Sequence, residues 1–467
     1  VAAAKPVART SDAIEPELAE IALNAGIPAT AITECKKTIL RRHGSSHISS
    51  ERLENAATAI AHLARELEDA VNTTPDLAAM RGLARDYLLS GRFSDTELVL
   101  ARAEDHDIKA AQTDLAITAA HLKSAARTRT WRGKLQEALH DYRRAARHYG
   151  LAVRHVPRGD HAARWHFSKM QVEALIAAEA EFADKAALNE AAKICSETIV
   201  LLHDNDCKLP RAEAKGLLGR LLIRQGAQYG DLSALASARR HLTDAAQQFE
   251  EAGEVSAAHA VLQRRADACR LFGEARSDES ALSEAVTIYE MLLEVADNAG
   301  EPETSMILRR KLGLAMAALG VKLKNDKLLE TARETLELEY LAGSNDEALT
   351  AGMTEAALGR ALFALGLLRN DDEPVKKAIR IMRRALLESD AAGSSVASAL
   401  MRNDLANMLR HRAEASGEPS AIDEVRVLKA EALLGLGDDH EALAEDVRLD
   451  LARLDDEVCG TTAVANG

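Results

Sequence analysis

Small residues recur along this chain at intervals of 46 to 49 residues, each within the same short pattern of large apolar side chains. With Ala238 as the reference position, the equivalent residues are Thr96, Ala145, Ala191, Ala285, Ala332, Ala378 and Val425. A large apolar residue stands three positions earlier in every copy, at Phe93, Tyr142, Leu188, Leu235, Leu282, Leu329, Val375 and Ile422. Four positions after the reference stand Leu100, Tyr149, Cys195, Leu242, Tyr289, Leu336, Met382 and Lys429, of which only Lys429 is charged. Because these three positions share one face of a helix, the pattern predicts a helix with a buried stripe in each copy.

A second helix is predicted ahead of this one in each copy. We call the helix with the stripe helix B and the preceding one helix A. Nineteen positions before the reference residue, the later copies carry another small residue, at Gly219, Ala266, Gly313, Gly359 and Ala406. Short side chains with an acceptor oxygen stand seven positions before the reference and are expected to cap helix B, at Asp184, Asp231, Asp278, Asn325 and Asp371. Gly320 and Gly366 stand near the expected end of helix A, where they indicate C-caps.

The repeat length sets the fold class. A copy of about 47 residues holds two helices of about 20 residues and their turns. Since one hairpin cannot bury its stripe alone, the copies must stack on one another. The sequence therefore predicts an all-α protein, an α-solenoid of about eight helix-turn-helix repeats that form a curved superhelix, with an N-terminal helical segment.

Composition agrees with helices and narrows the function classes. Aromatic residues make up 3% of the 467 residues and there are 9 prolines, whereas strands favour aromatic and β-branched side chains. The net charge of −14 argues against wholesale nucleic-acid binding, and no apolar window is long enough to span a membrane. The five cysteines are widely spaced, which favours a reducing, cytoplasmic setting over a disulfide framework.

Three segments resemble the tetratricopeptide repeat (TPR) family. Residues 92–98 (RFSDTEL) and 140–149 (HDYRRAARHY) resemble its second-helix signature. Residues 402–409 (RNDLANML) resemble its first-helix signature, in a long-helix form common in bacterial arrays. The family's ordinary unit has about 34 residues, so these units imply helices extended by one to two turns. The resemblance covers residues 76–437 and implies a scaffold whose A helices line a concave surface that binds proteins or peptides, without catalytic activity.

Five segments are expected along the chain. Residues 1–13 are predicted to be a flexible N-terminus, and residues 14–75 a helical cap or a linker to an upstream domain. The TPR-like solenoid follows over residues 76–437. Residues 438–457 are expected to form a C-terminal capping helix, and residues 458–467 a flexible tail.

The A helices supply the first candidate binding residues. If they line the concave side, as the resemblance implies, polar donors along them suit an extended peptide backbone or carboxylates. These candidates are Arg220, Arg224, Gln263, Arg270, Arg310, Arg360, Asn403 and Asn407. The alternative is that they are polar residues facing solvent without a ligand.

A basic segment is the second candidate. Residues 121–170 hold twelve Lys and Arg against three acids, together with six histidines and both tryptophans, Trp131 and Trp165. The candidate patch residues are Arg143, Arg144, Arg147, Arg154, Arg158 and Arg164. Such a patch could attract an acidic peptide, a phosphate-bearing ligand or the acidic C-terminal half of the chain. The alternative is a solvated helix face, with the tryptophans packed between repeats. The spacing of His140, His148 and His155 fits a metal site poorly.

Motifs for catalysis are missing from the sequence: it has no phosphate-binding glycine loop, no H-E-x-x-H and no G-x-S-x-G. We therefore expect a non-enzymatic scaffold with no cofactor and no metal, which binds a protein or peptide partner. An acidic partner is one option. An alternative is a regulatory or sensor arm of a larger signalling or effector enzyme whose catalytic domain lies outside this chain. Self-association is a third hypothesis, and nucleic-acid binding through the basic segment comes last.

Overall fold

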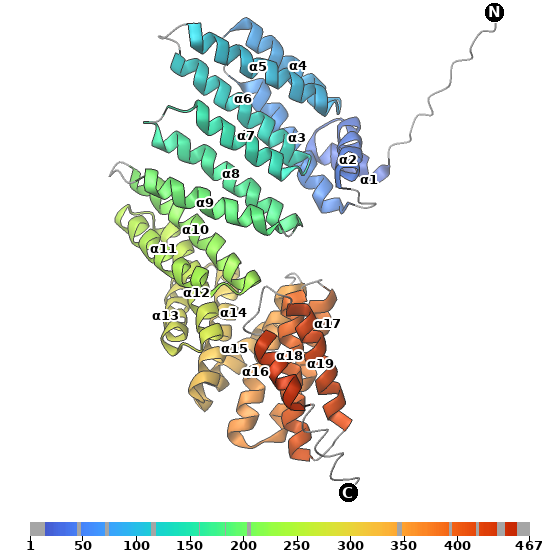
Figure 1. The fold of residues 1–467 in the computed structure, drawn as a ribbon, viewed down its shortest axis with the longest axis vertical. Coiled ribbons are helices and arrows are strands. Elements are labelled where there is room, and N and C mark those ends of the chain that lie inside the picture. Colours follow the sequence, from blue (N-terminus) through green and yellow to red (C-terminus); the bar gives the residue numbers. More distant parts are fainter. Residues whose placement is uncertain are drawn as a thin grey trace, which may run out of the picture. The chain divides into compact units, whose positions relative to one another are not determined.

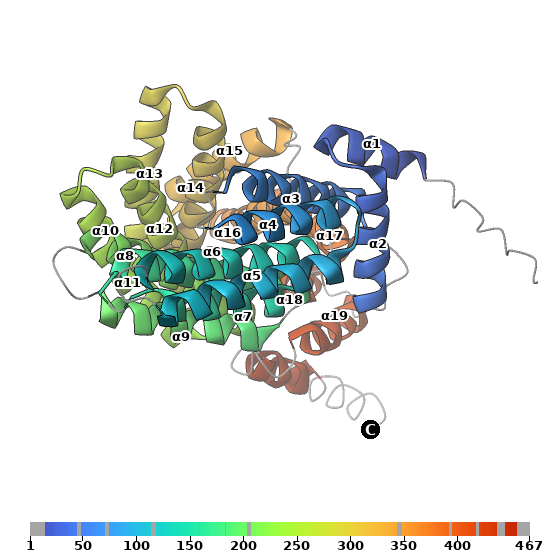
Figure 2. The same cartoon turned by 90° about the horizontal axis from the view of Figure 1, so that it is seen from above.

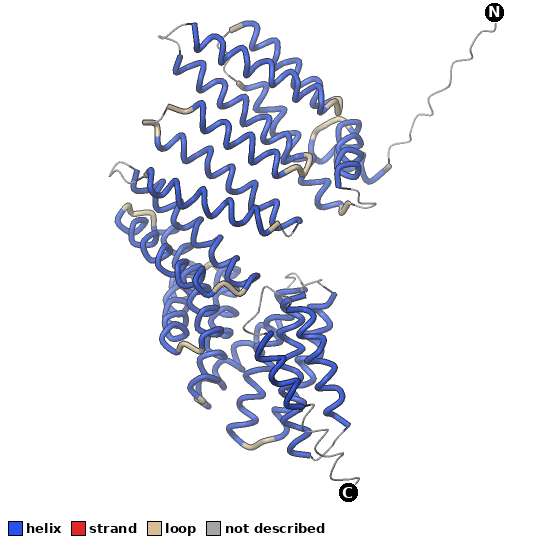
Figure 3. The backbone as a smooth tube through the Cα atoms, viewed as in Figure 1, coloured by secondary structure: helices blue, strands red, loops and turns tan. Residues whose placement is uncertain are grey.

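Every regular element of the protein is a helix in the part of the chain that the structure describes (Figure 3). The structure is a computed structural model. It describes residues 15–43, 48–70, 74–113, 118–157, 159–182, 184–202, 207–342, 348–391, 395–416, 420–436 and 444–454. The expected flexible ends, residues 1–13 and 458–467, lie outside the described residues. The prediction of an all-α chain is confirmed.

Three helices precede the repeats: α1 (Pro16–Ala25), α2 (Ala29–His43) and α3 (Ser50–Asp69). Eight hairpins follow, each with an A helix and a B helix. They are α4 (Pro75–Leu89) with α5 (Phe93–Thr113), α6 (Thr118–Ala138) with α7 (Tyr142–His155), α8 (His161–Phe182) with α9 (Lys185–Leu201), α10 (Lys208–Tyr229) with α11 (Leu232–Glu251), α12 (Val255–Arg276) with α13 (Glu279–Ala299), α14 (Pro302–Leu323) with α15 (Asp326–Ala342), α16 (Ala348–Arg369) with α17 (Asp372–Ala391), and α18 (Ser395–Ser416) with α19 (Ser420–Leu436). The eight described hairpins match the predicted repeats.

The chain divides into two compact units, Val1–Ala214 and Lys215–Gly467. In each unit, successive helices pack side by side in chain order, as Figure 1 shows for α4 to α9 and for α12 to α19. In the second unit the A helices α12, α14, α16 and α18 also contact one another from repeat to repeat. This sequential packing is that of a helical repeat solenoid, as predicted.

The predicted stripe forms the core of every hairpin. The reference residues Thr96, Ala145, Ala191, Ala238, Ala285, Ala332, Ala378 and Val425 are all 0% exposed. The eight residues four positions later are also buried, including Lys429 at 1% exposure. The predicted caps are present as well: Asp184, Asp231, Asp278, Asn325 and Asp371 each accept a hydrogen bond from a backbone N–H in the first turn of helix B. Both patterns are therefore confirmed, except that Tyr142 and Ile422, three positions before the reference, are only partly buried.

Glycines in the A helices receive the large side chains of the B helices. A Cβ added at Gly219 would lie 2.4 Å from Leu242 Cγ, and one at Gly313 would lie 2.9 Å from Leu336 Cδ2. One more pair forms near the end of the same A helix, where Gly320 meets Leu329. Gly320 and Gly366 lie near the ends of their helices, as expected, but neither is a C-cap, because both are still inside the helix. The missing Cβ makes room for a neighbouring side chain there, and the left-handed C-cap of α14 is Lys324 instead.

The N-terminal segment packs along the A helices of the first unit. Helix α3 lies against α4 and α6 (Figure 2), and its apolar face is buried. Helix α2 also reaches this side of the first hairpins: Cys35 Sγ donates to the carbonyl of Ala138 at 3.5 Å, and the ring of His43 stacks on Phe182 at 4.8 Å. Helices α2 and α3 therefore cover part of the A-helix side of three successive hairpins.

Residues 444–454 form a further helix in the segment expected to cap the C-terminus. Its Ala444 and Val447 are buried with Ala399 and Leu436. Asp450 from the same helix accepts a hydrogen bond from Lys429 at 2.8 Å. This helix thus packs on the last hairpin of the second unit.

We predict that Gly219→Ala destabilises the second unit although alanine is the better helix former. The added methyl group must displace Leu242, and such overpacking costs about 1–3 kcal/mol, against a gain of up to about 1 kcal/mol in helix propensity. Gly82 of α4 is the matched control, because an added Cβ there meets nothing within 4 Å. Gly82→Ala should therefore stabilise the chain. Thermal and urea unfolding followed by circular dichroism measure both changes, and a stabilising Gly219→Ala would contradict the packing argument.

Candidate functional site

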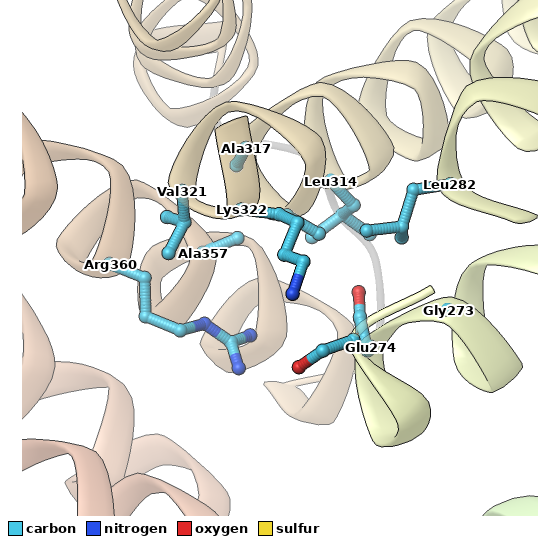
Figure 4. Close-up of a pocket in the computed structure, with 11 residues that line it drawn as sticks. Gly273, Glu274, Leu282, Leu314, Ala317, Val321, Lys322, Ala357 and Arg360 are labelled. Carbon is cyan, nitrogen blue, oxygen red and sulfur yellow. The ribbon is translucent and has the colours of Figure 1, made fainter. Parts of the chain in front are cut away.

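A pocket of about 400 Å³ opens on the A-helix side of the second unit (Figure 4). Three successive A helices, α12, α14 and α16, line it, together with Leu282 of α13. Its apolar lining includes Leu314, Ala317 and Val321 on one face of α14. Residues three and four positions apart lie on the same side of a helix, which explains why one face of α14 supplies most of the lining.

Three charged side chains stand at this pocket. Figure 4 shows the Lys322 ammonium and the Glu274 carboxylate pointing toward the same space, with the Arg360 guanidinium approaching from α16. Arg360 Nη1 lies 3.5 Å from Asp404 Oδ2, and the Arg360 side chain keeps 45% of its surface exposed. The pocket therefore has an apolar lining and a charged rim, and Arg360 is the one sequence-predicted candidate that lines it.

Arg270 is buried next to this rim. Its Nη1 donates to Glu274 Oε1 at 2.8 Å, one turn further along α12. Burial alone would lower the pKa of Arg270, but Glu274, Tyr289 and Asp267 outweigh it and raise the pKa above its ordinary value. Arg270 therefore stays charged and fixes the position of Glu274.

Asn403 and Asn407 of α18 are engaged within the chain. Both side-chain oxygens accept a hydrogen bond from Lys429 Nζ, at 2.9 Å and 2.7 Å. Beside them, burial raises the pKa of Asp404, which Arg360 and Lys429 lower in turn. These two candidates thus hold the buried ammonium of the last repeat, the position at which the apolar pattern fails.

Four other groove candidates lie away from this pocket: Arg220 and Arg224 on α10, Gln263 on α12 and Arg310 on α14. The positions three residues before the small residue of helix A therefore do not line the pocket. The positions one residue after it do, at Leu314 and Arg360. Sequence reasoning missed Glu274 and Lys322, which stand eight and nine positions after that small residue; the helical period extended along helix A would have reached both.

The candidate basic patch lies mostly on the B helix α7. Arg144, Arg147 and Arg154 are exposed there. Arg143 donates two hydrogen bonds to Asp184, at 2.7 Å and 2.9 Å, and one to Glu190 at 2.6 Å. Of the remaining candidates, Arg164 lies on α8. Arg158 lies outside the described residues.

The two tryptophans of the basic segment are buried at 3% exposure each. The indole N–H of Trp165 donates to Glu213 Oε2 at 2.9 Å, and the guanidinium of Arg81 lies 5.0 Å from the centre of the Trp131 ring. Both rings therefore pack within the first unit. The Trp165 N–H has a carboxylate as its partner, and the Trp131 ring has the Arg81 guanidinium.

Three of the six histidines of this segment, His140, His148 and His155, each lie beside a carboxylate. His140 Nδ1 lies 3.1 Å from Glu181, and His155 Nε2 lies 3.2 Å from Glu104. Burial chiefly lowers the pKa of His148 to about 3, helped by Arg132 and Arg129. Across the described ranges, no group of three His, Cys, Asp or Glu side chains is placed to bind a metal.

No protein-family model matches this sequence, and no curated protein matches it. Several solved structures are distantly similar, including the following two. A Signal Transduction ATPase with Numerous Domains (STAND) protein with a tetratricopeptide repeat sensor, from Pyrococcus horikoshii, aligns over 97% of this chain and 67% of its own, at 13% identity and a TM-score of 0.37. A circular tandem repeat protein aligns over 96% of this chain and 99% of its own, at 17% identity and a TM-score of 0.24. Because both scores are low, the TPR-like repeat fold rests on the packing of this chain's own hairpins.

The described helices include none that combines the length and the apolar character needed to cross a membrane. The four described cysteines, Cys35, Cys195, Cys207 and Cys269, are free and buried. Burial raises the pKa of the Cys35 and Cys269 thiols to about 12, so neither is a reactive thiolate at neutral pH.

One buried carboxyl group makes the first unit sensitive to pH. Tyr149 OH donates to Glu137 Oε2 at 2.7 Å between α7 and α6. Burial raises the pKa of Glu137 from 4.5 to about 7; Glu173 adds to this, and the Tyr149 hydrogen bond and Lys134 oppose it. Because the folded state holds this proton more tightly, its contribution to stability is complete below pH 4.5 and is lost as the pH rises through 7.

We predict that Glu137→Gln removes this loss and keeps the hydrogen bond from Tyr149. The free energy of unfolding of the variant should match that of the wild type near pH 4.5 and exceed it above pH 7.5, by up to about 3 kcal/mol. Urea unfolding at a series of pH values measures the difference. A difference that does not change with pH would show that Glu137 has an ordinary pKa in the folded chain.

Proposed function

We propose that this chain is a non-enzymatic binding protein that holds an extended peptide on the A-helix side of its second unit. In this proposal an apolar side chain of the peptide enters the pocket between α12, α14 and α16. The observation that supports it most is the composition of this pocket, whose lining is apolar and whose rim is charged. Binding sites in proteins commonly combine these two features.

The charges at the rim favour an acidic residue next to that apolar side chain. Glu274 is already neutralised by Arg270 at 2.8 Å. Lys322 is exposed, and among the described residues no carboxylate lies within ion-pair distance of it. Arg360 keeps nearly half of its side chain exposed beside Asp404. The rim therefore retains a positive charge that can bind a ligand carboxylate. The Arg360 guanidinium can strengthen this binding with two parallel hydrogen bonds to the carboxylate.

The resemblance to TPR proteins supports the same location. It places the peptide-binding surface on the A helices, and in the second unit these helices contact one another along one side of the hairpins. No helix outside the hairpins packs along α12, α14 or α16 in the part of the chain that the structure describes. A peptide could therefore follow these helices over several repeats.

The test is a selection of peptides from a display library of random sequences against the whole chain, followed by binding measurements with variants. We expect the selected peptides to carry an acidic residue close to a large apolar one. Ala318→Trp, which fills the pocket, and the double variant Lys322→Gln with Arg360→Gln should each weaken binding at least 10-fold.

Arg380→Gln is the matched control, because Arg380 is an exposed arginine on the B helix α17, away from the pocket. It should leave the peptide affinity within 2-fold of the wild type. Circular dichroism confirms that each variant folds. Selected peptides that bind the pocket variants as tightly as the wild type, or a selection that enriches no sequence, would contradict the proposal.

A further inference from the structure

A second pocket, of about 560 Å³, lies in the first unit between α3, α6 and α8. Its volume falls within the range of about 300–1,000 Å³ that is typical of sites for small ligands. One face of α6 supplies Lys123, Arg127, Trp131 and Lys134, and α8 supplies His166 and Phe167. The end of α3 forms the third wall.

The apolar part of this pocket is fixed by buried contacts. The ring of Trp131 lies under the guanidinium of Arg81 at 5.0 Å, and Arg81 Nη2 donates to Ser124 Oγ at 2.7 Å. The wall formed by α3 is fixed by the ion pair between Lys134 and Glu66. An aromatic surface held in this way needs little reordering when it meets a flat apolar ligand.

Among the charged residues that line this pocket, Lys123 and Arg127 have no ion-pair partner in the part of the chain that the structure describes. Lys134 is neutralised by Glu66, and Asp160 caps α8 by accepting from the Ala163 N–H at 3.1 Å. Lys123 and Arg127 stand one turn apart on α6, both exposed, and no carboxylate among the described residues lies within ion-pair distance of either. Like charges at this spacing repel each other, so an anionic group between them would remove an unfavourable interaction.

The pKa of the buried Arg81 shows the effect of the same positive charges. Burial chiefly lowers its pKa, and the charge of Arg127 lowers it further, against the opposing effect of Asp107. A ligand anion beside Arg127 would therefore also reduce the repulsion between the Arg127 and Arg81 guanidinium groups.

We propose that this pocket binds a small organic anion with a flat apolar body, whose anionic group meets Lys123 and Arg127 and whose body lies against Trp131 and Phe167. Two acids at the edge that pair with none of the described cations of this pocket, Asp69 and Asp160, repel an extended polyanion. A single carboxylate or phosphate group on a compact ligand needs to approach only the two cations. This site takes a different class of ligand from the peptide surface, and its residues belong to the other unit.

The experiment is isothermal titration calorimetry of the whole chain with three ligands that share one ring system: 2-naphthoate, 2-naphthyl phosphate and 2-naphthol. We expect saturable binding of both anions and at least 10-fold weaker binding of the neutral naphthol. The ratio of the two anion affinities decides between a carboxylate and a phosphate head group. An absence of saturable binding at millimolar ligand, or equal binding of naphthol, would overturn the proposal.

Two double variants locate the binding. Lys123→Gln with Arg127→Gln should weaken the better anion at least 10-fold. Arg147→Gln with Arg154→Gln removes the same number of exposed charges from α7, outside the pocket, and should change the affinity by less than 2-fold. Equal weakening by both pairs would show that the general charge of this unit attracts the ligand, which would refute the site. The variant Lys322→Gln with Arg360→Gln should bind the anion unchanged, which keeps this test independent of the peptide proposal.

Discussion

The fold depends on the close approach of two helices within each hairpin. In several hairpins the large side chain four positions after the reference residue of helix B occupies the space that a Cβ would take on a glycine of helix A, as Leu242 does over Gly219 and Leu336 over Gly313. Each such contact buries apolar area at the cost of a glycine inside a helix, about 1 kcal/mol relative to alanine. The recurrence of the contact in these hairpins fixes their geometry, and with it the side of the A helix that faces away from helix B.

This contact could be read from the sequence because it is local. The residues that make it stand at constant spacing within one repeat, so the stripe, the caps and the number of hairpins followed from the pattern alone. The partners of polar side chains could not be read in the same way, because they come from neighbouring repeats. Asn407 looked like a free donor in a groove, yet it accepts from Lys429. The charge of Lys429, which broke the apolar pattern, was the available sign of this interaction.

Polar side chains at the same stripe position follow a common rule. Tyr149, Tyr289 and Lys429 each place a polar group at the end of a buried side chain, and each reaches an acceptor on the A side: Glu137, Asp267 and the α18 asparagines. A buried polar group without a partner would cost about 1–3 kcal/mol, so these acceptors are required once the stripe departs from apolar residues. At Glu137 the same arrangement leaves a carboxyl group where water is scarce, which raises its pKa to about 7.

The A-helix sides of the two units differ in which helices cover them, and this difference is the reason why we propose different ligands for the two units. In the first unit, α2 and α3 pack against the A helices, and α3 closes one side of the pocket. A long peptide would have to displace buried residues of α3, such as Ile60 and Leu63, whereas a compact ligand need not. In the second unit, α12, α14 and α16 carry no such segment among the described residues, and the pocket lies between these three helices. In the proposed function, the N-terminal segment, which the repeat pattern could not place, therefore leaves the second unit as the one available to a peptide.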